Sequence, residues 1–393
     1  MRSPQLLSRS SVPRVSHILN CGGLGGAERS VEWVATAFDR ARISSNFIFL
    51  YSGGPVANSI SKLGYPVKVL NWKDGRSCIG RLRLLKELRR NGAEIAHFHD
   101  ETPLTRWIGR IAGCAVTLFT QHGGSYITGI KSCPLAMLPV VRFDDQCTTL
   151  VLANSKWTER AHNCFYRRSP SLTRMIHLGL DPRLTSSGAT GGGSRLSPHP
   201  KRKQSCYVIT FIGRLEVYKG ALVLAELARE LNVRLGRSFE IRVVGDGSAR
   251  INLQELAQRY RVADQLKILG SLDDVAEELD SADVFVFPSL CNESFGIAPL
   301  EAVARGIPVV AFDVGAVREI LGEAPKSSIV APGDVIGMAE AILMWLRAER
   351  THWKNSGLDY VRTRFSVSAY AETLTRLYSE LLSNKVRLTN TFP

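Results

Sequence analysis

Two glutamates, Glu293 and Glu301, stand eight positions apart and give the sequence its strongest chemical signal. Glu293 lies in a turn after a predicted buried strand, and Glu301 lies about two turns into the helix that follows. The first N–H groups of that helix, near 295–297, are free to bind an anion. The pattern predicts a phosphate at the helix start with a carboxylate on either side to hold hydroxyl groups. The alternative is a charged helix face, but Leu300 and Ala302 flank Glu301, which disfavours a solvent-facing position.

Two cations, Arg214 and Lys219, follow another predicted strand and stand five positions apart. Gly213 and Gly220 bracket their loop, so both side chains can reach one diphosphate. A lone surface cation is more often simply solvated. The position of this pair at the carboxyl end of a strand is what favours a phosphate site.

A glycine-rich turn at 22–26 follows the first predicted strand and leads into a helix, an arrangement whose free N–H groups can bind an anion. A nicotinamide site is disfavoured because Glu28 replaces the third glycine of the dinucleotide fingerprint, and because no acidic residue follows the second strand. A tight turn without any ligand stays open as the alternative.

Apolar strands alternate with amphipathic helices along most of the chain, which predicts parallel sheets. The predicted strands are 15–19, 47–50, 67–70, 95–98, 116–120 and 150–153, then 207–212, 240–244, 266–269, 284–287, 308–312 and 328–330. These form two doubly wound halves. Ligands of such sheets bind at the carboxyl ends of the strands, which predicts a cleft between two facing domains.

The domain boundaries follow from composition. Residues 185–205 are rich in Gly, Ser and Pro and predict a linker between an acceptor-binding domain at 1–184 and a donor-binding domain at 206–365. Residues 366–393 carry apolar positions at helical spacing, which predicts a terminal helix that crosses back to the first domain.

The 393 residues carry 50 Lys and Arg against 36 Asp and Glu, a net charge of +14. Residues 1–200 hold 26 of these basic and 12 of the acidic residues, so the whole excess lies in the first half. Such a field favours an anionic partner. The densest stretch, 76–90, predicts a basic amphipathic helix, with a packed crossover helix and a membrane-surface helix equally favoured.

Several classes of protein are excluded or disfavoured. No apolar run is long enough to cross a bilayer, and the N-terminus lacks the apolar core of a secretory signal, so we expect a cytoplasmic protein. Eight cysteines lie singly without a C-x-x-C pair, and no D-x-D motif is present, so we expect no metal and no cofactor. Nucleic-acid binding is disfavoured because aromatic residues do not interleave the basic ones.

Seven motifs in order resemble a known family: GGLGGAER, HFHD, FTQHGG, ANSKWTER, FIGRLEVYKG, VVGDG and ESFGIAPLEAVARGIPVVAFDVGAVREI. The chain resembles the retaining glycosyltransferases of the E-x7-E group, which is family 4-like and is also called group 1. The resemblance covers most of the chain. It implies the GT-B fold, in which two Rossmann-like α/β domains face a cleft, and a nucleotide diphosphate sugar as donor.

The resemblance also assigns roles to matching residues. Arg214 and Lys219 would hold the diphosphate, Glu301 the ribose hydroxyls, and Glu293 the sugar. His122 matches the family's cleft histidine near the anomeric centre. The remaining implied donor contacts are Gly25, Gly26, Leu272 beside the base, and the loop residues Ser294, Phe295, Gly296 and Ile297. Ser294 stands where glycine is common, and Ala316 replaces one glycine of a frequent pair.

The implied reaction moves a sugar, with retention and without a metal ion, to a saccharide or lipid-linked acceptor. Attachment to the inner face of the cell membrane through the basic first domain is an open possibility. The alternatives are a catalytically silent nucleotide-sugar-binding protein and an enzyme similar to glucan synthases and phosphorylases. His97 and His99 are interpreted as strand-end residues with satisfied hydrogen bonds.

Overall fold

The structure is a computed structural model that describes residues 12–73, 78–99, 103–123, 138–166, 169–185, 206–348 and 353–389. Its contacts divide the chain into two compact units. Unit 1 comprises Met1–Thr120, Ala136–Val151 and Ser368–Pro393, and unit 2 comprises Gln121–Leu135 and Leu152–Val367. Each unit therefore combines segments that are far apart in the sequence.

The first sheet has seven strands in the order β3-β2-β1-β4-β5-β6-β7. The pairs β1/β2, β1/β4, β2/β3 and β4/β5 run parallel, and the order reverses between β1 and β4, as in a doubly wound sheet. The strands are β1 Arg14–Cys21, β2 Ser44–Ser52, β3 Val67–Val69, β4 Ile95–His99, β5 Val116–Gln121, β6 Leu150–Ala153 and β7 Thr173–Met175.

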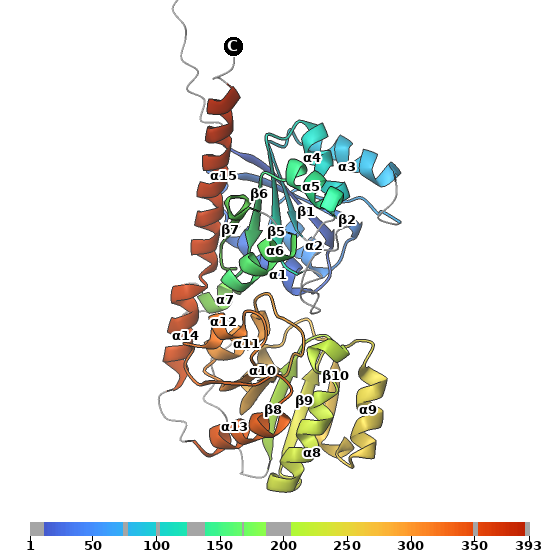
Figure 1. The fold of residues 1–393 in the computed structure, drawn as a ribbon, viewed down its shortest axis with the longest axis vertical. Coiled ribbons are helices and arrows are strands. Elements are labelled where there is room, and N and C mark those ends of the chain that lie inside the picture. Colours follow the sequence, from blue (N-terminus) through green and yellow to red (C-terminus); the bar gives the residue numbers. More distant parts are fainter. Residues whose placement is uncertain are drawn as a thin grey trace, which may run out of the picture. The chain divides into compact units, whose positions relative to one another are not determined.

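Helices cover both faces of this sheet because alternate strand residues point to opposite sides. Leu19 and Phe47 pack on one side with apolar residues of α1 and α2. Ile18 and Ile48 pack on the other side with those of α3 and α4 (Figure 1). The helices are α1 Gly26–Ala37, α2 Pro55–Lys62, α3 Cys78–Arg90, α4 Pro103–Ala112, α5 Leu138–Cys147, α6 Lys156–Tyr166 and α7 Pro182–Thr185.

The second sheet lies in unit 2 and has six strands in the order β10-β9-β8-β11-β12-β13. The neighbouring strands β10/β9, β9/β8, β8/β11, β11/β12 and β12/β13 pair in parallel, and the order reverses between β8 and β11. Strands β11 and β12 are buried at every position, as expected for a parallel sheet covered on both faces. The strands are β8 Tyr207–Ile212, β9 Phe239–Val244, β10 Leu266–Gly270, β11 Val284–Phe287, β12 Val309–Phe312 and β13 Ser327–Val330.

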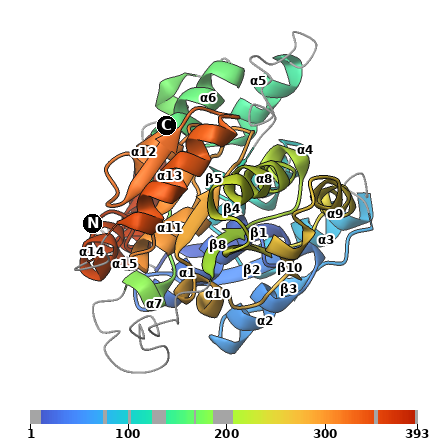
Figure 2. The same ribbon diagram turned by 90° about the horizontal axis from the view of Figure 1, so that it is seen from below.

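The helices of unit 2 fill the crossovers between these strands. Helix α13 packs against α8, and α9 lies at the β10 side of the sheet (Figures 1 and 2). Helix α14 packs on α11 with Gly357 at the crossing, where a Cβ would overlap the backbone oxygen of Val303. The helices are α8 Val223–Leu235, α9 Arg250–Arg259, α10 Ala276–Asp280, α11 Ile297–Ala304, α12 Val317–Leu321, α13 Val335–Arg347 and α14 Trp353–Arg364.

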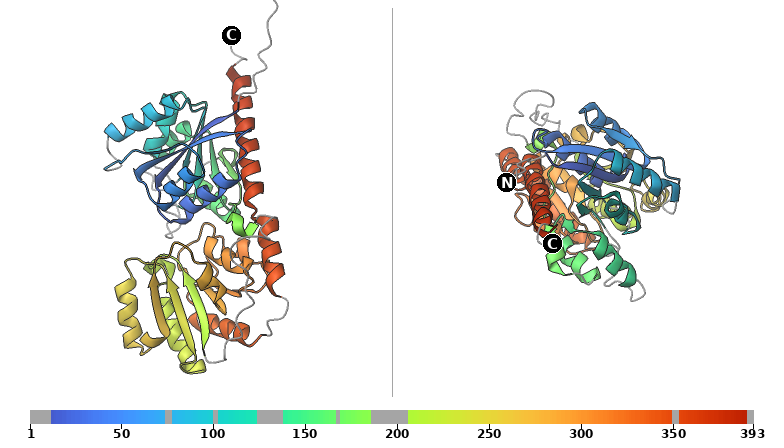
Figure 3. Two further views of the ribbon diagram at one scale, coloured as in Figure 1. Left: turned by 180° about the vertical axis from the view of Figure 1, so that it is seen from behind. Right: turned by 90° about the horizontal axis from the view of Figure 1, so that it is seen from above.

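The last helix, α15 (Val367–Thr389), belongs to unit 1 from Ser368 onward. The Tyr378 side chain is fully buried and its hydroxyl lies 2.7 Å from Nδ1 of His97 on β4. At the surface, Arg42 pairs with Glu372. Figure 3 shows this helix in dark red alongside the first sheet. Because its apolar face is buried, packing rather than the exposed ion pair holds the helix.

The α/β prediction is confirmed, because all twelve predicted strands are present, and within the part of the chain that the structure describes only the three-residue strand β7 was missed. The predicted linker lies outside the described residues except at Thr185, so the domain boundaries and the cleft stay predictions. Among the helices of the described residues, none combines the length and the apolar character needed to cross a bilayer.

Candidate functional site

The centre of the candidate site is an ion pair between Lys219 and Glu293. Nζ of Lys219 lies 2.7 Å from Oε1 and 2.8 Å from Oε2 of Glu293. The Ser289 hydroxyl donates a third hydrogen bond, of 2.6 Å, to the same carboxylate. The Glu293 side chain is 9% exposed and that of Lys219 is 22% exposed. The pair is therefore largely shielded from water, and its carboxylate is held from two sides.

The two loops that carry this pair follow β8 and β11, the neighbouring strands at which the order of the second sheet reverses. Such a reversal separates the loops of neighbouring strands and leaves room for a ligand at their carboxyl ends. The location matches the general rule for binding sites in doubly wound sheets. The residues at this edge are therefore the candidate ligand contacts of unit 2.

Backbone contacts lock the two loops together. The backbone oxygen of Tyr218 accepts hydrogen bonds from the N–H groups of Leu290 and Cys291 at 2.9 and 3.0 Å. Gly220 has φ 79°, and a Cβ there would overlap the backbone oxygen of Pro288. Glycine is needed at this position for both reasons, because other residues rarely adopt this conformation and none would fit.

A third loop, after β12, fixes the backbone of Glu293. The N–H of Ala316 donates a 2.8 Å hydrogen bond to the Glu293 backbone oxygen. Gly315 has φ 59°, and a Cβ there would overlap the Glu293 backbone. Ala316 itself has φ −84°, an ordinary value. The missing second glycine of the family's frequent pair therefore causes no strain here.

Helix α11 begins directly after this loop. Gly296 precedes it with φ 110°, and the helix runs from Ile297 to Ala304 with Pro299 in its first turn. Proline is tolerated there because the first N–H groups of a helix have no intrahelical partner. Glu301 lies one turn further along and is half-buried. The predicted arrangement of a free helix start between two glutamates is thus present.

Ser294 ties this loop to the chain segments that follow β5 and β6. Its hydroxyl donates a 2.5 Å hydrogen bond to the backbone oxygen of His122. Its own backbone oxygen accepts bonds from the hydroxyls of Ser155 at 2.7 Å and Thr158 at 3.0 Å. A glycine, common at this position in the family, would keep the last two bonds and lose the first. The Ser294 side chain therefore adds one hydrogen bond that holds this loop in place.

The structure places the other predicted residues in different surroundings. Arg214 is exposed, with its guanidinium carbon 5.9 Å from the ring centre of Tyr218. Leu272 is half-buried after β10, whereas Phe295 is buried against His177 and Phe365. His122 is half-buried at the end of β5.

Gly25 and Gly26 lie in unit 1, at the start of α1. The carboxylate of Glu28 folds back over Gly25, where a Cβ would overlap it. The thiol of Cys21 donates to Oε1 of Glu28 at 3.5 Å. Burial raises the pKa of this thiol, and the neighbouring Glu28 charge adds to the shift, so the sulfur stays protonated near neutral pH.

One network was missed by sequence reasoning. Glu319 on α12 accepts hydrogen bonds from the N–H groups of Lys156 and Trp157 at the start of α6, and from Nε2 of His177. Burial would raise the pKa of Glu319, but these hydrogen bonds outweigh it and lower the value. A carboxylate at a helix start is stabilising. The Asn154-Ser155 start signal of α6 was visible in the sequence, but its distant partner Glu319 was not.

Two family models match the chain. Residues 24–184 match "Glycosyltransferase Family 4" and residues 196–358 match "Glycosyl transferases group 1". Among curated proteins, a phosphatidyl-myo-inositol mannosyltransferase of Mycobacterium leprae is 31% identical over 54% of this chain and 57% of its own length. EpsF of Bacillus subtilis, a putative glycosyltransferase, is 26% identical over 77% of this chain and 80% of its own length.

The match is partial for some relatives. The chain spans just over half the length of the mannosyltransferase and 27% of an exopolysaccharide phosphotransferase of Streptomyces coelicolor. Solved structures match along almost the whole chain. A glycosyltransferase of Rickettsia africae has a TM-score of 0.76 at 17% identity, covering 95% of this chain and 99% of its own.

Anabaena Alr3699/HepE in complex with UDP has a TM-score of 0.73 at 20% identity, covering 93% of this chain and 100% of its own. At such low identity, these likenesses establish the fold and nothing finer. Taken together, the two family models cover both sheets of the structure, in the order expected from the motifs. The chain therefore belongs to the glycosyltransferases of group 1 and family 4 type, which have the GT-B fold.

Proposed function

We propose that this protein transfers a sugar from a nucleotide diphosphate sugar to a saccharide or lipid-linked acceptor, with retention and without a metal ion in the chemistry. The observation that carries the proposal is the Lys219–Glu293 pair beside the start of α11, at the strand reversal of the second sheet. A surface ion pair with a purely structural role would not need this position, two locked loops and a free helix start.

The charges suit the cleavage of a sugar–phosphate bond, which builds negative charge on the leaving phosphate. A lysine ammonium has three donors, and the carboxylate of Glu293 occupies two of those of Lys219. The third donor, the exposed Arg214 and the N–H groups at the start of α11 can then stabilise the phosphate. These groups take the role that a metal ion has in other transferases.

In a reaction with retention, the acceptor hydroxyl attacks from the face that the phosphate leaves, and a phosphate oxygen accepts its proton. The protein then contributes mainly by positioning the reactants and by electrostatics. Glu293 and the loop from Ser294 to Ile297 would hold the sugar and the phosphate. His122 would approach the sugar from the β5 side, and Gly25 and Gly26 would contact the donor phosphates. Leu272 would lie beside the base, and the ribose hydroxyls would bind Glu301.

The relatives support the substrate classes. The mycobacterial relative is named for mannosyl transfer to phosphatidyl-myo-inositol, and the Anabaena protein was solved with UDP and with UDP-glucose. These substrates support a nucleotide sugar as donor and a lipid or saccharide as acceptor. The sugar, the base and the acceptor are to be identified by a thermal-shift panel of nucleotide sugars, because bound ligand stabilises the native state.

Replacing Glu301 by glutamine is expected to raise KM for the nucleotide sugar by about 10- to 150-fold, with little change in the free energy of unfolding. The physical reason is that a hydrogen bond from a hydroxyl to a charged group contributes about 1.5–3 kcal/mol, and glutamine keeps the shape but not the charge. Steady-state kinetics against the donor identified by the thermal-shift panel measures this effect.

The matched control is Glu340→Gln on α13. This substitution removes the same charge at a position far along the chain from the donor loops. Unchanged KM in the Glu301 variant would remove the ribose contact from the proposal. Binding of the nucleotide sugar without any turnover would favour the catalytically silent alternative. Turnover with glycogen as acceptor would favour the enzyme similar to glucan synthases and phosphorylases.

We also propose that unit 1 docks on anionic lipid at the cytoplasmic face of a membrane, where a lipid-linked acceptor would be found. On α3, Ile79 is 64% exposed and Leu82 is 63% exposed, while Leu84 and Leu88 are buried. Exposed cations share the outer face: Arg83, Lys86, Arg89 and Arg90. A crossover helix needs only its buried side, so the outer apolar pair is the feature that favours membrane contact.

Vesicle flotation tests this docking. We expect binding to vesicles with anionic lipid but not to neutral ones, weakened by salt, and reduced at least tenfold in the Ile79→Ser, Leu82→Ser double variant. Each basic side chain near an anionic lipid surface contributes about 1 kcal/mol to the free energy of binding, which accounts for the expected dependence on lipid charge and salt. Val233→Ser on α8, where the valine is 79% exposed, removes a comparable apolar group elsewhere and should have no effect. Binding that ignores the lipid charge would rule out this docking.

A further inference from the structure

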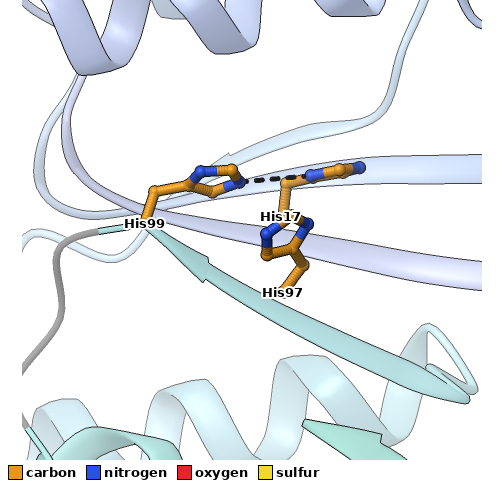
Figure 4. A group of neighbouring side chains, drawn as sticks. All are labelled: His17, His97 and His99. Atoms are coloured by element: carbon orange, nitrogen blue, oxygen red, sulfur yellow. Dashed lines mark hydrogen bonds between the residues drawn. The ribbon is translucent and has the colours of Figure 1, made fainter. Parts of the chain in front are cut away.

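Three histidines meet inside unit 1. His17 lies on β1, and His97 and His99 lie on the neighbouring strand β4, with His17 directly opposite His97 in the ladder. All three side chains are buried, with at most 5% of any residue exposed. Figure 4 shows the three rings gathered on one side of the two strands. They lie where the order of the first sheet reverses.

The spacing of the ring nitrogens fits a metal ion. One ligand atom from each histidine lies within 4.8 Å of the other two. Nδ1 of His17 and Nε2 of His99 are 3.4 Å apart. Bonds of about 2.0–2.1 Å at tetrahedral angles would place two nitrogen ligands roughly 3.3 Å apart. The first two ligands therefore already stand at the required separation.

His17 also has an unusual environment for a core histidine. Its Nε2 atom is buried and has no hydrogen-bond partner among the described residues. A hydrogen-bonded histidine in a stable core would normally satisfy both nitrogens. Nδ1 is the nitrogen of His17 that faces His99, so Nδ1 is the atom offered to the ion, and Nε2 would carry the ring proton.

His97 is the third ligand and has two polar neighbours. Its Nδ1 lies 2.7 Å from the hydroxyl of Tyr378, and its Nε2 lies 2.7 Å from Oγ1 of Thr120. A metal-bound histidine usually donates its other ring N–H to an oxygen, which orients the ring. His97 would exchange one of its two hydrogen bonds for the metal and keep the other in this orienting role.

We propose that His17, His97 and His99 bind one zinc-class transition-metal ion as a structural site of unit 1. A set of imidazole ligands alone suits zinc and its neighbours rather than magnesium or calcium. The ion would join β1 to β4 and, through His97 and Tyr378, would support α15. It takes no part in sugar transfer, so the proposal does not depend on the proposed function.

The test uses the full chain, purified without a histidine tag. After incubation with Zn²⁺ and gel filtration, we expect about one zinc per chain by plasma mass spectrometry and a rise in Tm that saturates at one equivalent. Loading with Co²⁺ should give the intense visible bands of a tetrahedral site. The probe is the metal alone.

The variant His17→Phe removes a ligand but keeps the packing, since the His17 ring stacks on Phe47 and adjoins Phe38. We expect it to fold and to hold less than a tenth of the zinc. His162→Phe, which removes another buried histidine in unit 2, should keep the full amount. No zinc in the unaltered protein, or equal zinc in the His17 variant, would overturn the proposal and leave a metal-free histidine cluster.

Discussion

Replacing Lys219 by alanine is expected to lower kcat by at least 100-fold and to lower the free energy of unfolding by about 3–5 kcal/mol. The first effect follows from the loss of a cation at the leaving phosphate. The second arises because Glu293, 9% exposed, would keep only the hydroxyl of Ser289 as a side-chain partner among the described residues. A buried carboxylate without its counter-charge is costly. Urea unfolding and steady-state kinetics measure the two effects.

The double variant Lys219→Met, Glu293→Gln separates them. It removes both charges together, and replacing a whole buried pair by neutral groups of similar size is often neutral for stability. We therefore expect the free energy of unfolding to recover by more than half while turnover stays lost. If the double variant were as unstable as Lys219→Ala, the cost would lie in packing rather than in the unpaired carboxylate. If Lys219→Ala kept its turnover, Lys219 would have no role in transfer.

The pairing of Lys219 with Glu293 also shows where sequence reasoning stops. Both residues were predicted at carboxyl ends of strands, and both lie there. Their contact, however, depends on β8 and β11 being neighbours, and the two residues are 74 positions apart in a sequence that does not reveal the strand order. The sequence assigned Lys219 to the phosphate and Glu293 to the sugar. The structure adds that each first holds the other, and this determines how their variants must be interpreted.

The strands were predictable because parallel strands buried on both faces read as continuous apolar runs, such as Val284–Phe287. β7 was missed because only Thr173 of its three residues is buried. The histidine cluster was missed for a different reason. His97 and His99 were interpreted as strand-end residues with satisfied hydrogen bonds, and His17 was not considered with them, since it is 80 positions before His97 and becomes their neighbour only through the β1/β4 pairing.

Arg214 provides the cleanest test of phosphate stabilisation, because its side chain does little for the fold. It is exposed after β8, and its guanidinium has a ring contact with Tyr218 at 5.9 Å. We expect Arg214→Met to lower kcat about 100- to 1,000-fold, the usual cost of removing one charge-stabilising donor from a transition state. The free energy of unfolding should change by no more than about 0.5 kcal/mol, as for most surface substitutions.

The matched control is Arg259→Met at the end of α9, an exposed arginine in the same unit, which should leave both kinetics and stability unchanged. Comparing the change in KM with the change in kcat shows whether Arg214 acts in the transition state or only binds the donor. A group that acts on the developing phosphate charge lowers kcat, whereas one that only holds the ground-state diphosphate raises KM and leaves kcat alone. If Arg214→Met changed KM alone, Lys219 and the start of α11 would have to stabilise the leaving group without it. The Lys219→Ala variant should then lose far more than 100-fold, since the remaining cation of the β8 loop, Arg214, would not act on the leaving phosphate.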